Sequence, residues 1–234
     1  MRRVAIMQPY FLPYIGYWQL IDSVDEFIVY DNIEFTKKGW FNRNRILDND
    51  HDRLFTIPIK KDSDYLPVNK RLVSDDSAAE ISRTLRIIQN NYRKAPYFIT
   101  AYPIIESCFL SPEKNLFEYI YHSIKVICAY LDIETKITIS SSVAIDHGLK
   151  AEHKVIALCE AINAEVYINA IGGVELYDKA QFKASGLELQ FIRSHPIEYR
   201  QFQYPFVPWL SIIDVLMFND KATVKDMLKR YDLV

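Results

Sequence analysis

The sequence has few cysteines, and their pattern excludes several kinds of site. Cys108, Cys128 and Cys159 are the only ones among 234 residues. Their number is odd, their spacing is wide and no CxxC motif occurs. Structural disulfides and a cysteine-rich zinc site are therefore not expected, and a reducing cytosol fits this composition. We expect all three thiols to be small core residues on helices.

The sequence also lacks a long apolar run. The stretch 212–218 contains Asp214 and falls far short of the roughly twenty residues that span a bilayer. Near the start, Gln8 and Pro9 interrupt the apolar run too early for a signal peptide. We therefore expect a cytoplasmic protein without stable membrane insertion.

No excess of positive charge and no familiar catalytic signature is present. The formal net charge is −2, so nucleic acid is not the expected partner. The sequence contains no HExxH, GxGxxG, P-loop or G-x-S-x-G motif. Nothing in it requires a metal or a cofactor, and nothing indicates an oligomeric state.

Apolar and aromatic residues, by contrast, are plentiful. Half of the residues are hydrophobic, and there are 16 Tyr and 13 Phe but only 6 Gly. Such a chain can bury a substantial core, and with no Gly/Ser-rich or Pro-rich linker we expect residues 1–234 to form a single domain. The aromatic rings suit either this core or a surface that grips a partly apolar, hydroxyl-rich ligand.

The order of the predicted elements indicates an α/β protein. A strand at 3–7, a helix at 14–22 and a strand at 26–30 form the start of a parallel βαβ unit. A third strand is predicted at 54–59, and helices then dominate residues 76–132. The remaining predictions are strands at 136–140, 165–169 and 187–192 and helices at 149–162, 210–219 and 220–231. The expected fold is a mostly parallel, Rossmann-like sheet with a helical insertion around 76–132.

Ligands of open parallel sheets bind outside the carboxyl ends of the strands. The residues that follow predicted strands are therefore the first candidates for a site. They are Gln8, Asp31, the Ile171-Gly172-Gly173 segment and His195. The two glycines permit a close approach of the backbone to a ligand, or simply a turn.

Residues 8–17 form a turn stiffened by two prolines, which aims a helix N-terminus at a ligand and suits an anion. Tyr14 lies within it. Its F-x-P-x-x-G pattern is a faint echo of the phosphate-binding turn of nucleotidylyltransferases. The two histidines of that turn are missing here, and the spacing is one residue short. A rigid turn with a hydrophobic staple is the alternative.

Residues 37–45 combine four cations, two amides and an indole. Arginine holds phosphates and carboxylates bidentately, and asparagine reads hydroxyl or amide groups. A solvated charge run is the alternative. In a strand, Trp40, Asn42 and Asn44 would share one face. The candidate binding residues are Lys37, Trp40, Asn42, Arg43, Asn44 and Arg45.

Residues 194–214 hold the candidate acid–base groups. His195, Glu198 and Tyr199 together could supply general acid–base catalysis, with Asp31 as a further catalytic candidate. Ser211 and Asp214 could cap a buried helix or orient His195. Asp214 lies among apolar residues and must have a partner; Arg43, Arg45 and His195 are the candidates.

These motifs taken together resemble the WbqC-like protein family of bacteria. The resemblance covers nearly the whole chain. It runs through AIMQPYFLPYIGY at 5–17, Asp31, KKGW at 37–40, NRNR at 42–45, TIP at 56–58, YINAIGG at 167–173, HPIEY at 195–199 and PWLSIID at 208–214. Many members have a histidine before the Gln-Pro pair, where this chain has Met7.

Members of this family resemble products of gene clusters for the synthesis of O-antigen and other surface polysaccharides. The resemblance therefore implies a role in that synthesis. The expected function is an enzyme that modifies a nucleotide-linked sugar, by transfer of an acyl or aminoacyl group to a sugar amine. The expected partner is that sugar or a similar phosphorylated small molecule. The alternatives are a non-catalytic sugar-nucleotide-binding or scaffold protein of the same pathway, and a nucleotidylyltransferase-like enzyme.

Overall fold

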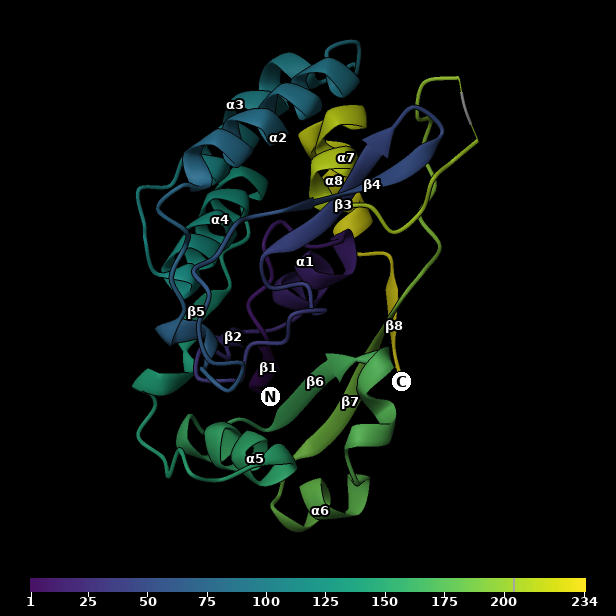
Figure 1. The fold of residues 1–234 in the computed structure, drawn as a ribbon. Coiled ribbons are helices and arrows are strands. Elements are labelled where there is room, and N and C mark those ends of the chain that lie inside the picture. The colour runs from purple at the N-terminus through teal and green to yellow at the C-terminus, as the bar shows by residue number, and fades with distance from the viewer. Residues whose placement is uncertain (204) are drawn as a thin grey trace.

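The computed structural model describes residues 1–203 and 205–234 and contains a mixed sheet with helices on both faces (Figure 1). The strands are β1 (Arg3–Met7), β2 (Glu26–Val29), β5 (Lys136–Ile139), β6 (Val166–Ala170), β7 (Glu188–Ser194) and β8 (Tyr231–Leu233). Their order is β5-β2-β1-β6-β7-β8, with every pair parallel except the antiparallel β7–β8 pair. The predicted class, α/β with a mostly parallel sheet, is confirmed.

Alternation along the strands divides the core into two layers. On β1, Val4 and Ile6 face one apolar cluster, while Ala5 faces the other. The first cluster is covered by α5 (Ala151–Ala161) and α6 (Lys179–Ala184). The second is covered by α1 (Ile15–Asp22), α4 (Leu116–Leu131), α7 (Ile212–Phe218) and α8 (Lys221–Leu228). Because successive side chains point to opposite faces, strands buried on both sides read as continuous apolar runs.

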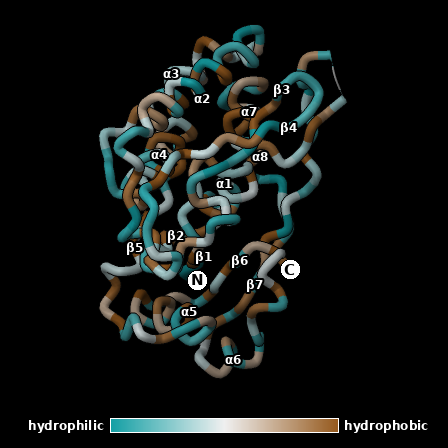
Figure 2. Tube along the Cα trace, in the orientation of Figure 1, coloured by the Kyte–Doolittle hydropathy of each residue, from teal (hydrophilic) through white to brown (hydrophobic). Residues whose placement is uncertain are grey.

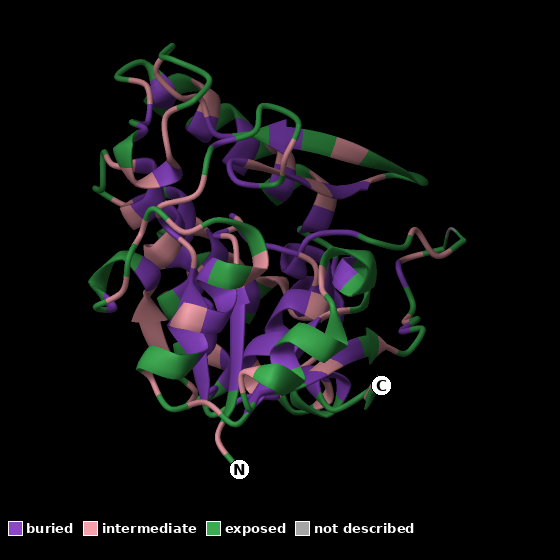
Figure 3. Cartoon of the chain, turned by 90° about the horizontal axis from the view of Figure 1, so that it is seen from below, coloured by how far each residue is buried: buried purple, intermediate pink, exposed green. Residues whose placement is uncertain are grey.

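The buried strands and the inner helices carry most of the hydrophobic residues. Figure 2 draws α7 mostly in the colour of hydrophobic residues, and all seven of its residues are buried. Figure 3 shows buried residues along the central strands and exposed ones on the surrounding loops and helix surfaces. Among the described residues, no helix is both long enough and apolar enough to cross a bilayer.

The predicted helical insertion is confirmed. It consists of α2 (Ser77–Tyr92), α3 (Phe98–Phe109) and α4, which follow one another between the hairpin described next and β5. The three cysteines are free and buried, as expected. Two lie on α3 and α4 and the third on α5, which agrees with their predicted place on helices.

The strand predicted at 54–59 was misplaced. The chain instead forms an antiparallel hairpin of β3 (Arg43–Asp48) and β4 (His51–Thr56), which is separate from the main sheet. The connecting residue Asn49 has φ of 60°, the left-handed conformation that asparagine adopts in tight hairpin turns. The hairpin lies beside α7 (Figure 1), and the two elements are in contact.

Candidate functional site

The sheet reverses its direction of winding between β1 and β6, and a cavity lies at that place. The chain runs from β1 to β2 on one side, whereas β6 and β7 lie on the other. This is the position at which parallel sheets form a ligand crevice. The cavity has a volume of about 430 Å³. It is lined by Met7, Tyr10, Tyr14, Gly16, Tyr17, Leu20, Trp40, Asn44, Ala170, Ile171, Ile192, Ser194 and Trp209; we call it the aromatic cavity.

Five of its thirteen lining residues are aromatic, and they come from the segment 10–17 and from Trp40 and Trp209, which are distant from it in sequence. The rings of Tyr14 and Trp209 lie 5.1 Å apart, and those of Tyr10 and Tyr17 lie 5.8 Å apart. Trp209 is 65% exposed, although its ring is a wall of the cavity. Its φ of 62° lies in the left-handed region, which is uncommon outside glycine. Backbone held in this way is found preferentially at functional sites.

The tyrosine hydroxyls of the cavity are hydrogen-bond donors at neutral pH. Burial raises the pKa of Tyr10 and Tyr14 above the ordinary value, and the pKa of Tyr17 well above it. Tyr10 donates to the Gln8 side-chain oxygen, and Tyr17 donates to the Gln8 carbonyl oxygen, both at 2.9 Å. Gln8, a predicted binding residue, thus orients two rings of the wall from behind.

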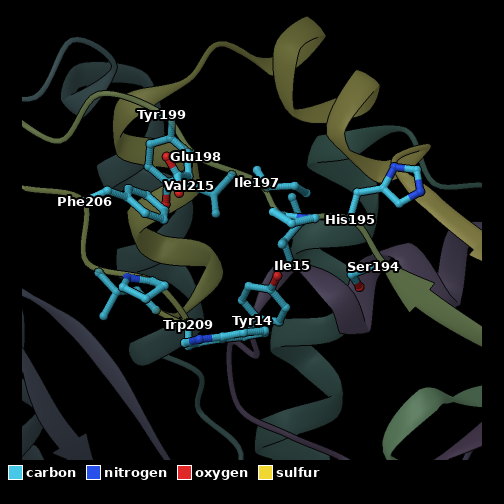
Figure 4. Close-up of a pocket in the computed structure, with 13 residues that line it drawn as sticks. Tyr14, Ile15, Ser194, His195, Ile197, Glu198, Tyr199, Phe206, Trp209 and Val215 are labelled. Carbon is cyan, nitrogen blue, oxygen red and sulfur yellow. The ribbon is translucent and has the colours of Figure 1, made fainter.

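A smaller cavity of about 170 Å³ adjoins the aromatic cavity and shares Tyr14, Ser194 and Trp209 with it (Figure 4). The predicted residues His195, Glu198 and Tyr199 line this smaller cavity. The three predicted acid–base residues therefore lie next to the aromatic cavity. Their side chains nevertheless do not converge on one point.

The imidazole of His195 points away from Tyr14 and Trp209 in Figure 4. Its Nε2 lies 3.0 Å from Oδ1 of Asp232 on β8, and the pair is about half exposed. The His195 amide also donates to the Arg230 carbonyl oxygen at 3.0 Å. His195 therefore ties the end of β7 to the C-terminal strand, and its role as a general base stays a prediction. Glu198 is exposed at the rim of the smaller cavity.

Asp31 is buried and surrounded by donors. Its carboxylate accepts hydrogen bonds from Asn69, from the Ser140 hydroxyl and from the amide and hydroxyl of Ser141, at 2.7–2.9 Å. Burial alone would raise its pKa, but these hydrogen bonds prevail and lower it. A carboxylate held this way clamps the end of β2 to the end of β5. It does not line either cavity described above.

The arginines of the hairpin flank Trp40 at the edge of the aromatic cavity. The guanidinium carbons of Arg43 and Arg45 lie 5.7 and 5.2 Å from the centre of the indole ring. Arg43 donates to the carbonyl oxygens of Gly39 and Lys38. Arg45 is 3.4 Å from Asp52. The cluster therefore presents an indole flanked by two guanidinium groups.

The two asparagines of the cluster are buried and structural. The Asn42 side chain donates to the Ile57 carbonyl oxygen at 2.7 Å, and that of Asn44 donates to the Leu12 carbonyl oxygen at 2.9 Å. Ser211 also donates to the Leu12 carbonyl, at 2.6 Å, while capping α7. Leu12 has φ of 46°, so the proline-rich turn is a strained segment fixed by the hairpin and by α7.

Asp214 is fully buried, and its predicted partners were wrong. Neither arginine reaches it, and His195 pairs elsewhere. It accepts hydrogen bonds from the hydroxyls of Tyr92 (2.9 Å) and Tyr199 (2.6 Å) and from the Gln201 amide (2.6 Å). Burial raises its pKa to about 6, although the three donors oppose the rise. Two tyrosine hydroxyls and one glutamine amide, all neutral donors, therefore take the place of the predicted cationic partners.

Three further predicted residues, Gly172, Gly173 and Lys37, line neither of these two cavities. Gly173 packs against the Asn169 side chain so closely that a Cβ would be 2.5 Å from its nitrogen, whereas Gly172 has open space beside it. Lys37 is exposed and pairs with Asp64 at 2.8 Å. Sequence reasoning missed Tyr10, Tyr17 and Trp209 as wall residues. The signal for them was present, since all three lie inside the motifs already quoted.

Among the residues that line the aromatic cavity in the described chain there is no carboxylate and no imidazole. Met7 lines it at the position where many proteins of the resembled family have a histidine. The two-histidine chemistry of nucleotidylyl transfer therefore finds no support at this site. Over residues 1–203 and 205–234, no group of three or more His, Cys, Asp or Glu side chains could hold a metal ion.

Comparison with known proteins identifies the family. The WbqC-like protein family matches residues 8–226. The chain belongs to the WbqC-like protein family. It is also similar to the uncharacterized protein Rv1507c of Mycobacterium tuberculosis, with 29% identity over 232 residues that cover 98% of each chain. No solved structure matches the chain. The resemblance inferred from the sequence motifs is thereby confirmed for this WbqC-like protein.

Proposed function

We propose that this WbqC-like protein binds a nucleotide-linked sugar in the aromatic cavity and modifies it in bacterial surface-polysaccharide (O-antigen) biosynthesis. The proposed reaction is transfer of an acyl or aminoacyl group to a sugar amine. The amine attacks the acyl carbonyl, loses a proton to a base, and the donor's leaving group departs. The observation that carries the proposal is the aromatic cavity itself, at the carboxyl ends of β1, β6 and β7.

The dimensions and lining of the cavity suit such a ligand. A volume of about 430 Å³ lies within the range of small-molecule sites, which are mostly apolar with a few placed polar groups. Aromatic faces pack on the apolar faces of sugar rings and bases, and the tyrosine hydroxyls meet sugar hydroxyls. Arg43 and Arg45 beside Trp40 supply positive charge for phosphates at the rim.

Trp40→Ala tests the binding proposal. Wild-type protein should be stabilised by a matching nucleotide sugar, by roughly 2.7 kcal/mol when the ligand is at 100 times its Kd. Loss of the indole should weaken binding by roughly 1–3 kcal/mol, the scale of stacking between a base and an aromatic side chain. A thermal-shift screen over nucleotide sugars, followed by titration calorimetry, measures both effects.

Ile99→Ala is the matched control, because Ile99 is an 81% exposed hydrophobic residue on α3 that lines neither cavity. It should bind the nucleotide sugar as the wild type does. If no nucleotide sugar stabilises the wild type, or if Trp40→Ala binds normally, the proposal is wrong.

A non-catalytic sugar-nucleotide-binding protein of the same pathway is the second candidate. It is favoured by the absence of any carboxylate or imidazole among the described residues that line the aromatic cavity. His195→Asn and Asp232→Asn distinguish the candidates. If His195 is the general base, its replacement should lower turnover by roughly 10²–10⁴-fold, whereas Asp232→Asn should leave most of it.

If the pair serves only as a link between β7 and β8, both variants should lose at most roughly 1 kcal/mol of stability, as expected for an exposed ion pair. Both should then keep full turnover. The measurements are acyl transfer to the bound sugar and urea denaturation of the three proteins. A fully active His195→Asn variant would eliminate His195 as the base and direct attention to Glu198, which lines the smaller cavity.

A further inference from the structure

A second large cavity, of about 500 Å³, lies between the start of the hairpin and the loop that follows it. It shares no lining residue with the aromatic cavity. Its lining is rich in charge. The residues are Phe35, Lys37, Asn42, Arg43, Thr56, Ile59, Lys60, Lys61, Asp62, Ser63, Asp64 and Arg71; we call it the cationic cavity.

Positive charge outweighs negative charge in this lining. Five cationic side chains face two carboxylates. Lys37 is neutralised by Asp64, and Lys60 by Asp75 just outside the cavity, each at 2.8 Å. Within the described chain, Arg43, Lys61 and Arg71 have no carboxylate within 4 Å.

Arg71 is the least expected of these three cations, because its side chain is buried. It is only 2% exposed, and its guanidinium lies over the Phe35 ring with 4.6 Å between them. One terminal nitrogen donates to the Ser63 carbonyl oxygen at 2.6 Å. Its Nε is buried and has no hydrogen-bond partner among the described residues.

A buried guanidinium with no carboxylate within 4 Å is costly, because arginine keeps its charge and loses its hydration. An anion in the cavity would remove that cost. Arginine offers a planar fork that phosphate oxygens accept bidentately, and lysine adds a point charge. We propose that the cationic cavity is a binding site for a phosphate or diphosphate group, with Arg71 at its base and Lys61 and Arg43 at its mouth.

This proposal does not depend on the aromatic cavity holding a sugar. The group could belong to the diphosphate of a nucleotide-linked substrate or to a separate phosphorylated ligand. Asn42 and Arg43 of the cationic cavity are chain neighbours of Trp40 and Asn44 of the aromatic cavity, so the two cavities adjoin along one segment. The experiment below distinguishes a single extended ligand from two separate ligands.

The test uses inorganic pyrophosphate and inorganic phosphate as probes, each added at millimolar concentration to the whole protein. Binding is followed by ³¹P NMR and calorimetry. Arg71→Met keeps the length of the side chain but removes its charge. We expect it to weaken pyrophosphate binding roughly 10- to 150-fold, as loss of charge-assisted hydrogen bonds does.

Lys61→Ala is the second variant, because Arg71→Met alters a buried site and its effect on folding must be separated from its effect on binding. Lys61 is exposed, so its replacement should leave the fold intact and weaken pyrophosphate binding about tenfold. Lys94→Ala, at an exposed lysine beyond the end of α2, is the matched control and should bind pyrophosphate normally.

The outcomes separate this site from the proposed function. The cationic cavity is supported if Trp40→Ala binds pyrophosphate as the wild type does and Lys61→Ala binds it about tenfold more weakly. This result would stand even if no nucleotide sugar binds. Competition between pyrophosphate and a nucleotide sugar would assign the site to the substrate's diphosphate, and simultaneous binding would assign it to a second ligand. If neither probe binds the wild type, or if Lys61→Ala and a folded Arg71→Met bind pyrophosphate as well as wild type, the proposal is wrong.

Discussion

Asp214 joins three parts of the molecule through its carboxylate. Tyr92 reaches it from α2, while Tyr199 and Gln201 reach it from the segment after β7. The Tyr92 hydroxyl also accepts a hydrogen bond from the Leu47 amide at 2.7 Å, which connects the group to the hairpin. Tyr199 lines the smaller cavity, so the protonation of Asp214 is coupled to the surroundings of that cavity.

Asp214→Asn tests the ionisation of this carboxylate. The folded-state pKa is raised from 3.8 to about 6, so between these values the folded protein binds more protons than the unfolded chain. The free energy of unfolding must then fall as pH rises through this window, by roughly 3 kcal/mol for a shift of about two units. The asparagine variant lacks this contribution. The stability of the wild type relative to Asp214→Asn should therefore decrease between about pH 4 and pH 6.

Urea denaturation of both proteins across that range measures the difference, in which the other titrating groups cancel. Asp226→Asn, at an exposed carboxylate on α8, is the control and should not reproduce the effect. A difference between wild type and Asp214→Asn that stays constant with pH would contradict a raised pKa.

The partners of Asp214 show what a sequence can indicate about a single residue. A carboxylate among apolar residues predicts burial and predicts some partner. It does not identify that partner, because the nearest cations along the chain compete with neutral donors brought in by packing. Tyr92 is 122 positions away. Arg43 and Arg45 are instead held by Trp40, by backbone carbonyl oxygens and by Asp52.

At the scale of elements, long periodic segments were predicted well. The helices α1 and α5 and the strands β1, β2 and β6 lie within a few residues of their predicted bounds. These elements pack against the core layers, so the spacing of their apolar residues is enough to predict them.

The sequence did not predict β3 and β8, two strands whose structure depends on pairing with a neighbouring strand. The strand β3 begins inside the charged cluster, whose polar residues indicate a binding site more strongly than a strand. The strand β8 was not predicted, and its first residue, Tyr231, was assigned to a helix at 220–231 that in fact ends at Leu228. It is held by antiparallel pairing with the last residues of β7, and a segment this short has no periodicity to detect.

At the scale of the whole molecule, the site depends on strand order. The sequence identified the residues that follow β1, β6 and β7, but it could not place β1 next to β6. That neighbourhood arises because β2 and β5 lie on one side of β1, and β6 and β7 on the other. It brings the proline-rich turn, the segment after β6 and Trp209 to one crevice, and the hairpin then supplies Trp40.

If the proposed function is correct, one ligand should protect all of these segments together. Hydrogen exchange should slow on addition of a nucleotide sugar at residues 8–17, 36–44, 170–173 and 194–210. These segments carry most of the lining of the aromatic cavity and of the smaller cavity beside it. Binding suppresses the local openings through which exposed amides exchange. Helices α5 and α6 cover the opposite face of the sheet and serve as an internal reference that should not change.

Trp40→Ala should abolish the joint protection at the same ligand concentration, because the weakened complex is no longer populated. Pyrophosphate alone should instead slow exchange at residues 60–71, beside the cationic cavity, and leave residues 170–173 unaffected. If a nucleotide sugar protected only residues 60–71, the aromatic cavity would not be where the sugar binds. Protection of α5 and α6 would place the ligand on the opposite face of the sheet.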